Sequence, residues 1–273
     1  MIVCAITGST GVLGRKIKKI LPFKFYEFKN NILNKKEVDE WVLKKNFDII
    51  IHLAALVPTK SVNKDFKKAY EVNVNGTNNL INSVLKKKKK PKWFFYASSS
   101  HVYKTTYKTK KINEKEVPRP QNKYGKTKLL AEKLLIKKLK KSSIKLCIGR
   151  IFSFTDKNQK PPFLIPSIIQ KLKSKSKTIN FKNLNHYRDF LSLKDIVLAI
   201  DTLRKKNKIG IYNIGSGKEF DLKDIASLFA KKYKKKIDFR NYNKPSFLIS
   251  DNKKILKTSW KPKKFNNNID YFY

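Results

Sequence analysis

The sequence predicts an α/β protein with a doubly wound parallel sheet and a smaller C-terminal cap. Short, continuously apolar segments alternate with segments of helical periodicity through the first 150 residues. This alternation is typical of parallel strands that helices cover on both faces. A glycine-rich turn joins the first apolar segment to the first helical one. After residue 150, prolines and polar stretches interrupt the alternation, so we expect a separate, smaller region there.

The expected elements follow from these patterns in chain order. Strands are expected at 2–6, 24–28, 48–53, 93–98 and 145–151. Helices are expected at 14–21, 35–45, 64–86, 123–140, 163–173, 192–204 and 221–235. We assign residues 1–150 to the sheet domain. Residues 151–273 mainly form the cap, with segments that return to the sheet, and they cover the carboxyl edge where open α/β sheets bind ligands.

The glycine-rich turn runs from Gly8 to Gly14 and follows the first expected strand. Gly8 permits the tight turn, Gly11 lets the backbone approach a pyrophosphate, and Gly14 lets the helix pack closely on the strand. Backbone N–H groups and the helix dipole at this point attract an anion. The turn therefore predicts nucleotide binding in a Rossmann-type domain, although glycines also occur in purely structural turns.

The chain carries a formal net charge of +44, from 64 Lys and Arg against 20 Asp and Glu. Nucleic-acid binding is one explanation of such a charge. Only six of the cations are Arg, the residue suited to bidentate contacts with phosphates and bases, and the lysines are spread along the whole chain. We therefore interpret most of them as solvated and expect no specific nucleic-acid partner.

The two cysteines, Cys4 and Cys147, both lie in apolar segments expected to be interior strands, which indicates no disulfide framework. The strongly apolar run at 49–57 is too short to span a bilayer, and no targeting segment is expected because the first strand begins at residue 2. No cluster of His, Cys and carboxylates has metal-ligand spacing. We expect a cytoplasmic protein without membrane or metal binding.

Tyr124 and Lys128 stand four residues apart at the start of an expected helix, so their side chains share a face. An ammonium near a phenol lowers the pKa of the phenol, which would bring Tyr124 toward neutrality and make it a general acid/base. Ser99 belongs to a serine cluster at the end of the 93–98 strand and can hydrogen-bond the same substrate oxygen. Taken alone, Tyr124 and Lys128 are also consistent with two surface residues of a helix. The serine cluster is likewise consistent with an ordinary loop after a strand.

Further motifs follow in order along nearly the whole chain. They are His52-Leu53-Ala54-Ala55, Asn73-Val74-Asn75-Gly76-Thr77-Asn78-Asn79-Leu80, Ser98-Ser99-Ser100-His101-Val102-Tyr103, Arg150-Ile151-Phe152, Arg188-Asp189-Phe190, Tyr212-Asn213-Ile214-Gly215-Ser216-Gly217 and Trp260-Lys261-Pro262. With the glycine turn and the Tyr124/Lys128 pair, this set resembles the extended short-chain dehydrogenases/reductases, the NAD(P)-dependent nucleotide-sugar epimerase, dehydratase and reductase family.

The resemblance implies an NAD(P)-binding Rossmann domain, a substrate-binding cap and a role for each matched residue. The implied catalytic residues are Ser99, Tyr124 and Lys128. NAD or NADP is implied to contact Gly8, Gly11, Val12, Leu13, Asn31, Ile32, Leu53, Ala54, Ala55, Asn73, Tyr124 and Lys128. The nucleotide-sugar substrate is implied to contact Ser99, His101, Ser153 and Arg188, with the Arg188 guanidinium on the diphosphate.

The resemblance implies an enzyme that acts at C4 of a nucleotide-linked sugar, as a 4-keto(-6-deoxy)sugar reductase or as an epimerase. The family's dehydratases carry an Asp-Glu pair where this chain has Ser100 and His101, which disfavours dehydration. The short loop after the 24–28 strand resembles the reductases, whereas the core motifs are equally those of 4-epimerases. His101 is either an additional acid/base group or an ordinary loop residue.

Two further questions stay open in the sequence. Glu27 is the only acidic candidate to bind the cofactor ribose, while Arg15 and Lys29 favour a 2′-phosphate. The sequence therefore does not decide between NAD and NADP as the cofactor. A non-catalytic protein that uses the dinucleotide fold to bind nucleic acid or another polyanion is the alternative to an enzyme. The family also implies a possible homodimer through the helices at 64–86 and 123–140.

Overall fold

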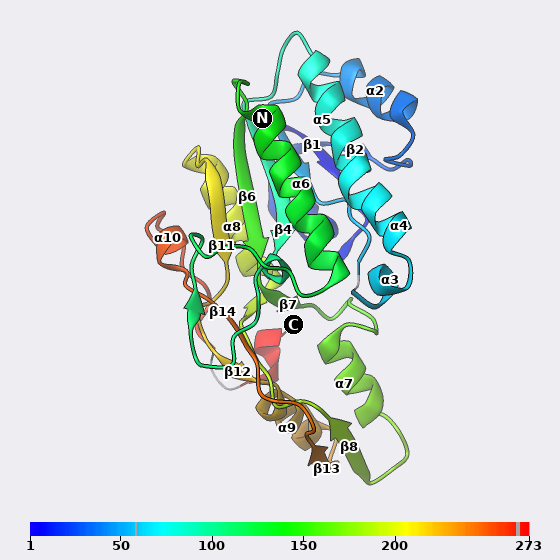
Figure 1. Cartoon of the computed structure of the whole chain (residues 1–273), viewed down its shortest axis with the longest axis vertical. Coiled ribbons are helices and arrows are strands. Elements are labelled where there is room, and N and C mark those ends of the chain that lie inside the picture. Colours follow the sequence, from blue (N-terminus) through cyan, green and yellow to red (C-terminus); the bar gives the residue numbers. More distant parts are fainter. Residues whose placement is uncertain (58, 266–267, 273) are drawn as a thin grey trace.

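The computed structural model describes residues 1–57, 59–265 and 268–272. Its centre is a six-stranded sheet in the order β11-β6-β4-β3-β1-β2 (Figure 1), in which all the neighbouring strands run parallel. The strands are β1 (Val3–Thr7), β2 (Lys24–Phe28), β3 (Ile49–His52), β4 (Trp93–Ser99), β6 (Lys145–Ile151) and β11 (Gly210–Ile214). The predicted doubly wound parallel sheet is confirmed.

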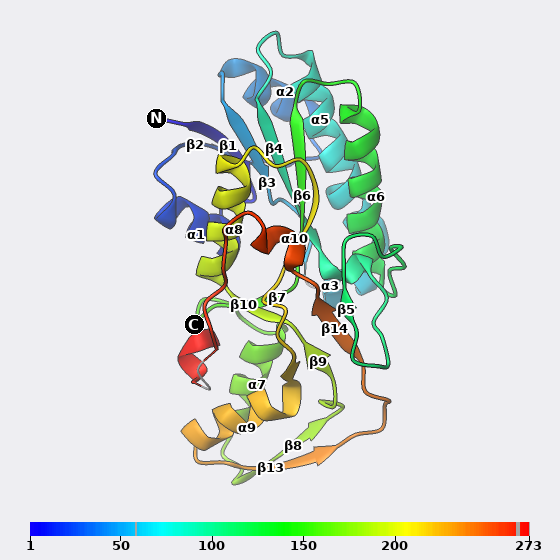
Figure 2. The same cartoon turned by 90° about the vertical axis from the view of Figure 1, so that its left-hand side faces the viewer.

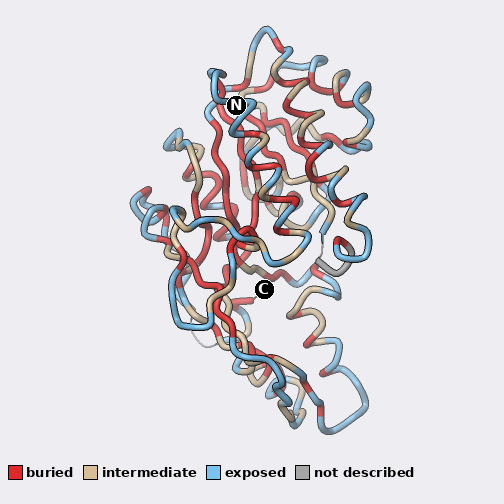
Figure 3. The backbone as a smooth tube through the Cα atoms, in the orientation of Figure 1, coloured by how far each residue is buried: buried red, intermediate tan, exposed pale blue. Residues whose placement is uncertain are grey.

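Helices cover both faces of this sheet (Figure 2). On one face lie α1 (Val12–Ile20) and α8 (Leu193–Lys205); on the other lie α2 (Lys35–Lys44), α5 (Gly76–Lys86) and α6 (Lys123–Leu139). Alternate side chains of each strand enter opposite cores: Cys4 and Ile6 pack toward α1 and α8, and Ala5 packs toward α2 and α5. Two buried faces explain why the inner strands β1, β3, β4 and β6 are mostly apolar and are buried over nearly their whole length (Figure 3), whereas the edge strand β2 is only partly buried.

The single helix expected at 64–86 is divided, so that prediction is wrong in detail. The chain forms α3 (Thr59–Lys64), α4 (Phe66–Tyr70), a π-helical turn η1 (Glu71–Asn75) and then α5. Asp65 starts α4 because its carboxylate accepts a hydrogen bond of 2.9 Å from the Lys68 N–H. Such π turns are frequent at functional sites.

The cap lies beyond the carboxyl edge of the sheet and has its own apolar core. Its elements are α7 (Leu164–Leu172), β8 (Thr178–Lys182), α9 (Leu222–Lys232), β13 (Lys236–Arg240) and the C-terminal turn η3 (Ile269–Phe272). Shorter elements connect it to the sheet: η2 (Ser100–Val102), β5 (Lys111–Ile112), β7 (Ser153–Thr155), β9 (Tyr187–Arg188), β10 (Phe190–Ser192), β12 (Phe220–Asp221), β14 (Phe247–Ser250) and α10 (Lys253–Leu256). Between the cap segments, α8 and β11 return to the sheet.

Both thiols are buried and free, Cys4 in β1 and Cys147 in β6, as expected for interior strands. Within the described parts of the chain, none of the helices has the length and apolar character that crossing a bilayer requires.

Candidate functional site

A cavity of about 990 Å³ lies between the carboxyl edge of the sheet and the cap. Its walls contain every predicted site residue except Asn73. The predicted residues that line it are Gly8, Gly11, Val12, Leu13, Asn31, Ile32, Leu53, Ala54, Ala55, Ser99, His101, Tyr124, Lys128, Ser153 and Arg188. The fold therefore brings together motifs that are spread over 180 residues of sequence.

The glycine turn forms one end of the cavity. Gly8 has a φ of 70°, and a Cβ there would lie 2.7 Å from the Ala54 nitrogen, so this glycine serves the backbone. A Cβ on Gly14 would collide with the Gly8 carbonyl, which explains the close packing of α1 on β1. Gly11 is different, because it is exposed and a Cβ would meet only the Gly8 carbonyl oxygen, at 3.3 Å.

The first turn of α1 has no side-chain cap at Gly11. Its backbone N–H groups at Val12 and Leu13 therefore remain available to a ligand in the cavity that these residues line. A dinucleotide pyrophosphate fits this end because the turn offers N–H donors, a favourable helix dipole and a residue without a side chain.

The serine and tyrosine motifs meet at the wall of the cavity. Asn122 caps α6 by accepting a hydrogen bond of 2.8 Å from the Gly125 N–H. A Cβ on Gly125 would collide with the His101 carbonyl, so the missing side chain lets α6 approach the turn after β4. This approach brings Tyr124 close enough to Ser99 for the serine hydroxyl to affect its ionisation, and both residues line the cavity. One helical turn further, the buried Lys128 ammonium lies 4.3 Å from the centre of the Tyr96 ring.

The ionisation of this pair differs from the expectation. Burial raises the pKa of Tyr124 to about 12, although the neighbouring Ser99 hydroxyl opposes this rise. The prediction that Lys128 brings the Tyr124 pKa toward neutrality is thus wrong for this structure. Burial also lowers the pKa of Lys128 to about 7, against the opposing effect of the Glu132 carboxylate, because desolvation disfavours a charged form. At neutral pH Tyr124 is a protonated phenol, which is the form that donates a proton.

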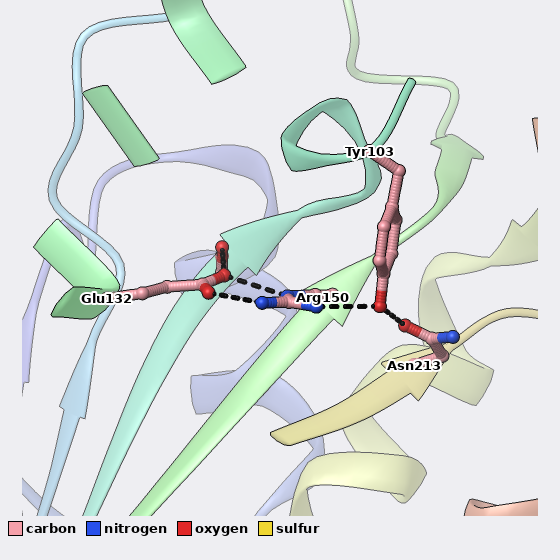
Figure 4. A network of polar contacts seen from close by, with 5 residues as sticks. Tyr103, Glu132, Arg150 and Asn213 are labelled. Atoms are coloured by element: carbon pink, nitrogen blue, oxygen red, sulfur yellow. Dashed lines mark hydrogen bonds and ion pairs between the residues drawn. The ribbon is translucent and has the colours of Figure 1, made fainter. Parts of the chain in front are cut away.

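A buried polar network links α6 to the end of β4, the strand that carries Ser99 (Figure 4). The Arg150 guanidinium donates two hydrogen bonds to Glu132, of 3.1 and 2.7 Å, and one of 2.8 Å to the Tyr103 hydroxyl. That hydroxyl donates to Asn213, again at 2.8 Å, and the Ser98 hydroxyl donates to Glu132. The network joins β4, β6, β11 and α6 near Ser99 and Lys128.

Asn73 does not line the cavity, in contrast to the expected direct contact with the cofactor. It is buried in the π turn, where its side-chain oxygen accepts a hydrogen bond of 2.6 Å from the Leu56 N–H. Its amide nitrogen donates to the Leu56 carbonyl at 3.3 Å and to the Thr127 hydroxyl at 2.9 Å. Asn73 therefore holds the backbone of Leu56, which does line the cavity, against α6.

His101 lies beside Tyr124, with 5.8 Å between the two ring centres. The Asn122 amide donates to Nδ1 at 2.9 Å, so this nitrogen is the acceptor. Burial, with a smaller effect of the Arg188 charge, lowers the pKa of His101 to about 4. A neutral imidazole at physiological pH serves as a hydrogen-bonding partner and not as an imidazolium acid. His52, by contrast, packs inside the sheet domain between Thr7 and Thr77, as expected.

Arg188 lines the cavity from the cap side. Its guanidinium donates to the Tyr187 and Ser246 carbonyls at 2.8 Å and has no carboxylate partner among the described residues. Arg188 forms no ion pair with the neighbouring Asp189, whose carboxylate accepts hydrogen bonds from Ser216, Gly217 and Ser250. Burial lowers the pKa of Arg188 to about 10, so the group keeps its charge at neutral pH.

The cavity is electropositive throughout. Its described lining includes Lys29, Lys128 and Arg188 but neither Asp nor Glu. Glu27 is directed elsewhere, because it forms an ion pair of 2.8 Å with Lys18, and this pairing lowers the Glu27 pKa. Such a lining suits anionic ligands with several phosphate groups.

Sequence reasoning missed several residues of the cavity wall. One of them is Asn30, which follows β2 next to Lys29, and a second group comes from the segment after β6. The members of the second group are Phe154, Thr155, Gln159, Pro162, Phe163, Leu164 and Ile165. The alternation of Ser153 and Thr155 along β7 signals a shared face, but a three-residue strand is too short to recognise from periodicity.

Comparisons with known proteins agree with this geometry. The family model described as GDP-mannose 4,6-dehydratase matches residues 9–268. The dTDP-D-glucose 4,6-dehydratase of Dictyostelium discoideum is 32% identical over 221 residues, which cover 77% of this chain and 50% of the relative. The GDP-6-deoxy-D-mannose reductase of Pseudomonas aeruginosa is 28% identical over 190 residues, which cover 67% of this chain and 62% of the relative. The chain thus spans less than two thirds of the length of either relative.

Solved structures show the same fold. RMD from Pseudomonas aeruginosa, complexed with NADPH, superposes with a TM-score of 0.90 at 21% identity and covers 98% of this chain and 95% of its own. The UDP-glucose 4-epimerase of Thermus thermophilus, complexed with NAD, gives a TM-score of 0.85 at 18% identity. The superposition covers 99% of this chain and 97% of the epimerase chain. From the ordered motifs, the parallel sheet and the match over residues 9–268, the chain belongs to the GDP-mannose 4,6-dehydratase family of extended short-chain dehydrogenases/reductases.

Proposed function

We propose that this chain is an NAD(P)-dependent oxidoreductase that acts at C4 of a nucleotide-linked sugar, as a 4-keto(-6-deoxy)sugar reductase or a sugar 4-epimerase. One observation carries the proposal. Ser99, Tyr124 and Lys128 lie together in the wall of the cavity that begins at the uncapped glycine turn. A protein that only bound polyanions would gain nothing from a buried Ser-Tyr-Lys set, so the geometry favours the enzyme.

The chain's own residues supply the proton and the orientation. A bound reduced nicotinamide supplies the hydride that converts a C4 carbonyl to an alcohol. Tyr124, protonated at neutral pH because its pKa is about 12, donates its proton to the C4 oxygen, and Ser99 holds that oxygen by a hydrogen bond. Lys128 is placed one helical turn from Tyr124 to hold the nicotinamide ribose, and its charge stabilises the phenolate that forms.

Dehydration of the sugar is not proposed, although dehydratases are among the relatives. The resemblance assigns water elimination to an acidic pair, and the described lining of the cavity contains no carboxylate. Ser100 and His101 occupy the corresponding positions, and His101 is neutral at physiological pH because burial lowers its pKa to about 4. Neither side chain replaces a carboxylate pair as base and acid.

We propose NADP(H) as the preferred cofactor. Lys29 and Asn30 follow the carboxyl end of β2 and line the cavity. Glu27, the acidic candidate for a ribose hydroxyl, is instead paired with Lys18. Arg15 is exposed beside the glycine turn, where it donates to the Thr10 carbonyl. A 2′-phosphate is attracted by these cations, and the carboxylate that would repel it is already neutralised.

The test is a panel of nucleotide sugars and nucleotide-linked 4-keto sugars, assayed with NADPH and NADH. A reductase oxidises one reduced cofactor for each keto sugar consumed. An epimerase interconverts two nucleotide sugars without net change in the cofactor. The dissociation constants of both cofactors come from the same preparation, and tighter binding of NADH would contradict the proposed preference. RNA binding that survives about 200 mM salt, without turnover, would favour the non-catalytic alternative.

We further propose a cytoplasmic homodimer without a specific nucleic-acid partner. Two buried free thiols support a reducing compartment. On the outer face of α6, Leu130 and Ile136 are 40% and 47% exposed among lysines, which supports an interface on this helix. Sedimentation measured against protein concentration tests the dimer, and a Leu130→Lys variant should shift it toward monomer.

A further inference from the structure

The side chain of Asn122 links the N-terminus of α6 to His101. Its Oδ1 accepts a hydrogen bond of 2.8 Å from the Gly125 N–H, and its Nδ2 lies 2.9 Å from Nδ1 of His101. A backbone N–H bonds only the oxygen of an amide, so the contact with Gly125 fixes which end of the Asn122 amide faces His101. The helix cap therefore presents an N–H donor to Nδ1.

This contact selects one tautomer of His101. Nδ1 accepts the hydrogen bond and carries no proton, and a neutral imidazole then carries its proton on Nε2. The ring is neutral at physiological pH, because burial lowers the pKa of His101 to about 4. The other tautomer would set two N–H groups against each other, or would require the Asn122 amide to turn and lose the cap.

The Nε2–H group of His101 is open to a ligand. His101 is partly exposed and lines the cavity. Within the described part of the chain, Nδ1 has a hydrogen-bond partner and Nε2 has none. Nε2 is nonetheless not one of the polar atoms that the described fold buries without a partner, so it keeps accessible surface. The protein leaves this donor free at a ligand cavity, and a ligand can supply the acceptor.

His101 lies near both groups to which the proposed function assigns the ends of the reacting sugar. Its ring packs edge-on against that of Tyr124, with 5.8 Å between the ring centres, and Tyr124 receives the C4 oxygen. Arg188, which suits the diphosphate, lines the same cavity and is close enough for its charge to lower the pKa of His101 further. The hexose is therefore the part of the substrate that meets Nε2–H.

We propose that Asn122 is a positioning residue that fixes His101 as an Nε2–H donor, and that His101 is a specificity-determining residue that binds a hexose oxygen beside C4. This inference rests on the proposed function. Hydrogens on the carbons next to a 4-ketone are acidic, and a base that removes one of them can change the configuration there. Protonated Nε2 has no lone pair to accept such a hydrogen. The site therefore recognises the neighbouring oxygen and leaves C3 and C5 unchanged.

Nuclear magnetic resonance of protein with isotopically labelled histidine nitrogens reads the tautomer directly. The chain has three histidines, and the signal lost in His101→Gln belongs to His101. In the wild type, at slightly alkaline pH, Nε2 should carry the proton and Nδ1 none. In Asn122→Asp the carboxylate still accepts from the Gly125 N–H but cannot donate, so Nδ1 should become protonated. A wild-type proton on Nδ1, or an unchanged tautomer in Asn122→Asp, would overturn the proposal.

Calorimetry tests the donor. His101→Phe keeps a ring without a donor, whereas His101→Gln supplies an amide N–H. His101→Phe should weaken binding of the preferred nucleotide sugar about 10- to 100-fold, and His101→Gln should recover part of that loss. UDP, GDP, dTDP and NADPH should bind the variants as they bind the wild type. A role in packing alone predicts the opposite order of the two variants. That order, or wild-type affinity in His101→Phe, would show that the donor binds no sugar.

Turnover in deuterium oxide tests proton transfer. With NADPH and a nucleotide-linked 4-keto sugar, the wild-type product should carry no more deuterium at C3 and C5 than the keto sugar incubated without enzyme. Deuterium above that level would overturn the proposal.

Asn113→Asp is the matched control for Asn122→Asp. The Asn113 side-chain oxygen accepts a hydrogen bond of 2.9 Å from the Lys115 N–H, and Asn113 lies outside the cavity lining. This variant should change neither the histidine signals nor any affinity. If the wild type binds no nucleotide sugar, the proposed function is wrong and the donor role falls with it, whereas the resonance measurement still decides the contact between Asn122 and His101.

Discussion

The carboxylate of Glu132 and the guanidinium of Arg150 form a doubly hydrogen-bonded ion pair in which the side chains are 1% and 3% exposed. Glu132 lies one helical turn after Lys128 on α6, and Arg150 lies on β6, beside the strand that carries Ser99. The pair joins α6, which carries Tyr124 and Lys128, to β6, and the Ser98 hydroxyl that donates to Glu132 joins both to β4, which carries Ser99.

Replacing Glu132 by Gln should destabilise the fold by about 3 kcal/mol, because it leaves the buried Arg150 charge without a counter-charge. Urea denaturation of the free enzyme measures this loss. The matched control is Glu116→Gln, which removes an ion pair with Lys110 whose side chains are 36% and 57% exposed. That variant should lose less than about 1 kcal/mol. Equal losses in the two variants would show that burial of the Glu132 pair has no special role.

Tyr124→Phe should lower turnover by about 10²–10⁴-fold, because it removes the proton that the C4 oxygen receives. Cofactor affinity and melting temperature should change little, since the ring stays in place. Ser99→Ala is the companion variant and should reduce turnover less, because Ser99 orients the oxygen without donating the reaction's proton. Turnover near the wild-type value in Tyr124→Phe would refute the proposed chemistry.

Gly11→Val should weaken dinucleotide binding more than it weakens the fold. A Cβ at Gly11 meets only the Gly8 carbonyl oxygen, at 3.3 Å, yet a branched side chain would stand where the pyrophosphate approaches. Gly8→Val is the contrasting variant, because its φ of 70° and the Ala54 backbone at 2.7 Å make any side chain unfavourable. Titration of NADPH and thermal melts measure the two effects. Unchanged affinity in Gly11→Val would assign the turn a purely structural role.

Arg188→Ala should weaken binding of nucleoside diphosphates about 30- to 150-fold, which corresponds to the 2–3 kcal/mol of a lost charge-assisted contact. NADPH affinity should persist, because the cofactor end of the cavity lies at the glycine turn. Arg240→Ala is the matched control, since Arg240 pairs only with the exposed Asp238 on β13. Wild-type diphosphate affinity together with a lower melting temperature would show that Arg188 merely holds the Tyr187 and Ser246 carbonyls.

Stability should fall as the pH drops from 7.5 to 5.5, partly because of His52. Burial, and to a lesser extent the Lys128 charge, lowers the pKa of His52 from 6.5 to about 3. In this pH window the unfolded chain binds a proton that the native state does not, so the native state loses about 1.4 kcal/mol relative to the unfolded state. His52→Asn should flatten the dependence by that amount in urea denaturation. An unchanged slope would show that His52 titrates normally in the fold.

The sheet domain could be predicted from sequence because its signals are local. A strand buried on both faces shows a continuous apolar run, as in residues 49–51 of β3, and the glycine turn fixes where the first helix begins. The cap could not be predicted in the same way. Its strands β9, β10 and β12 have two or three residues each, and such short segments carry no periodicity.

The site was predictable in its residues but not in its electrostatics. Spacing places Tyr124 and Lys128 on one helix face, and motif order places Ser99 nearby. Their pKa values depend on how deeply each group is buried, which the sequence does not encode locally. Asn73 shows the same limit, because the motif assigns it to the site while the fold directs its amide to the Leu56 backbone.

The interleaving of the cap with the sheet domain has a consequence for protein engineering. Ser153 and Arg188 reach the cavity before the chain returns to the sheet as α8 and β11, and β12, α9 and β14 come after that return. No single continuous fragment therefore contains the cap. A substrate range cannot be transplanted from a relative by one insertion or one terminal fusion. Exchange requires separate grafts on either side of 193–214, matched to each other, or point substitutions within the existing walls.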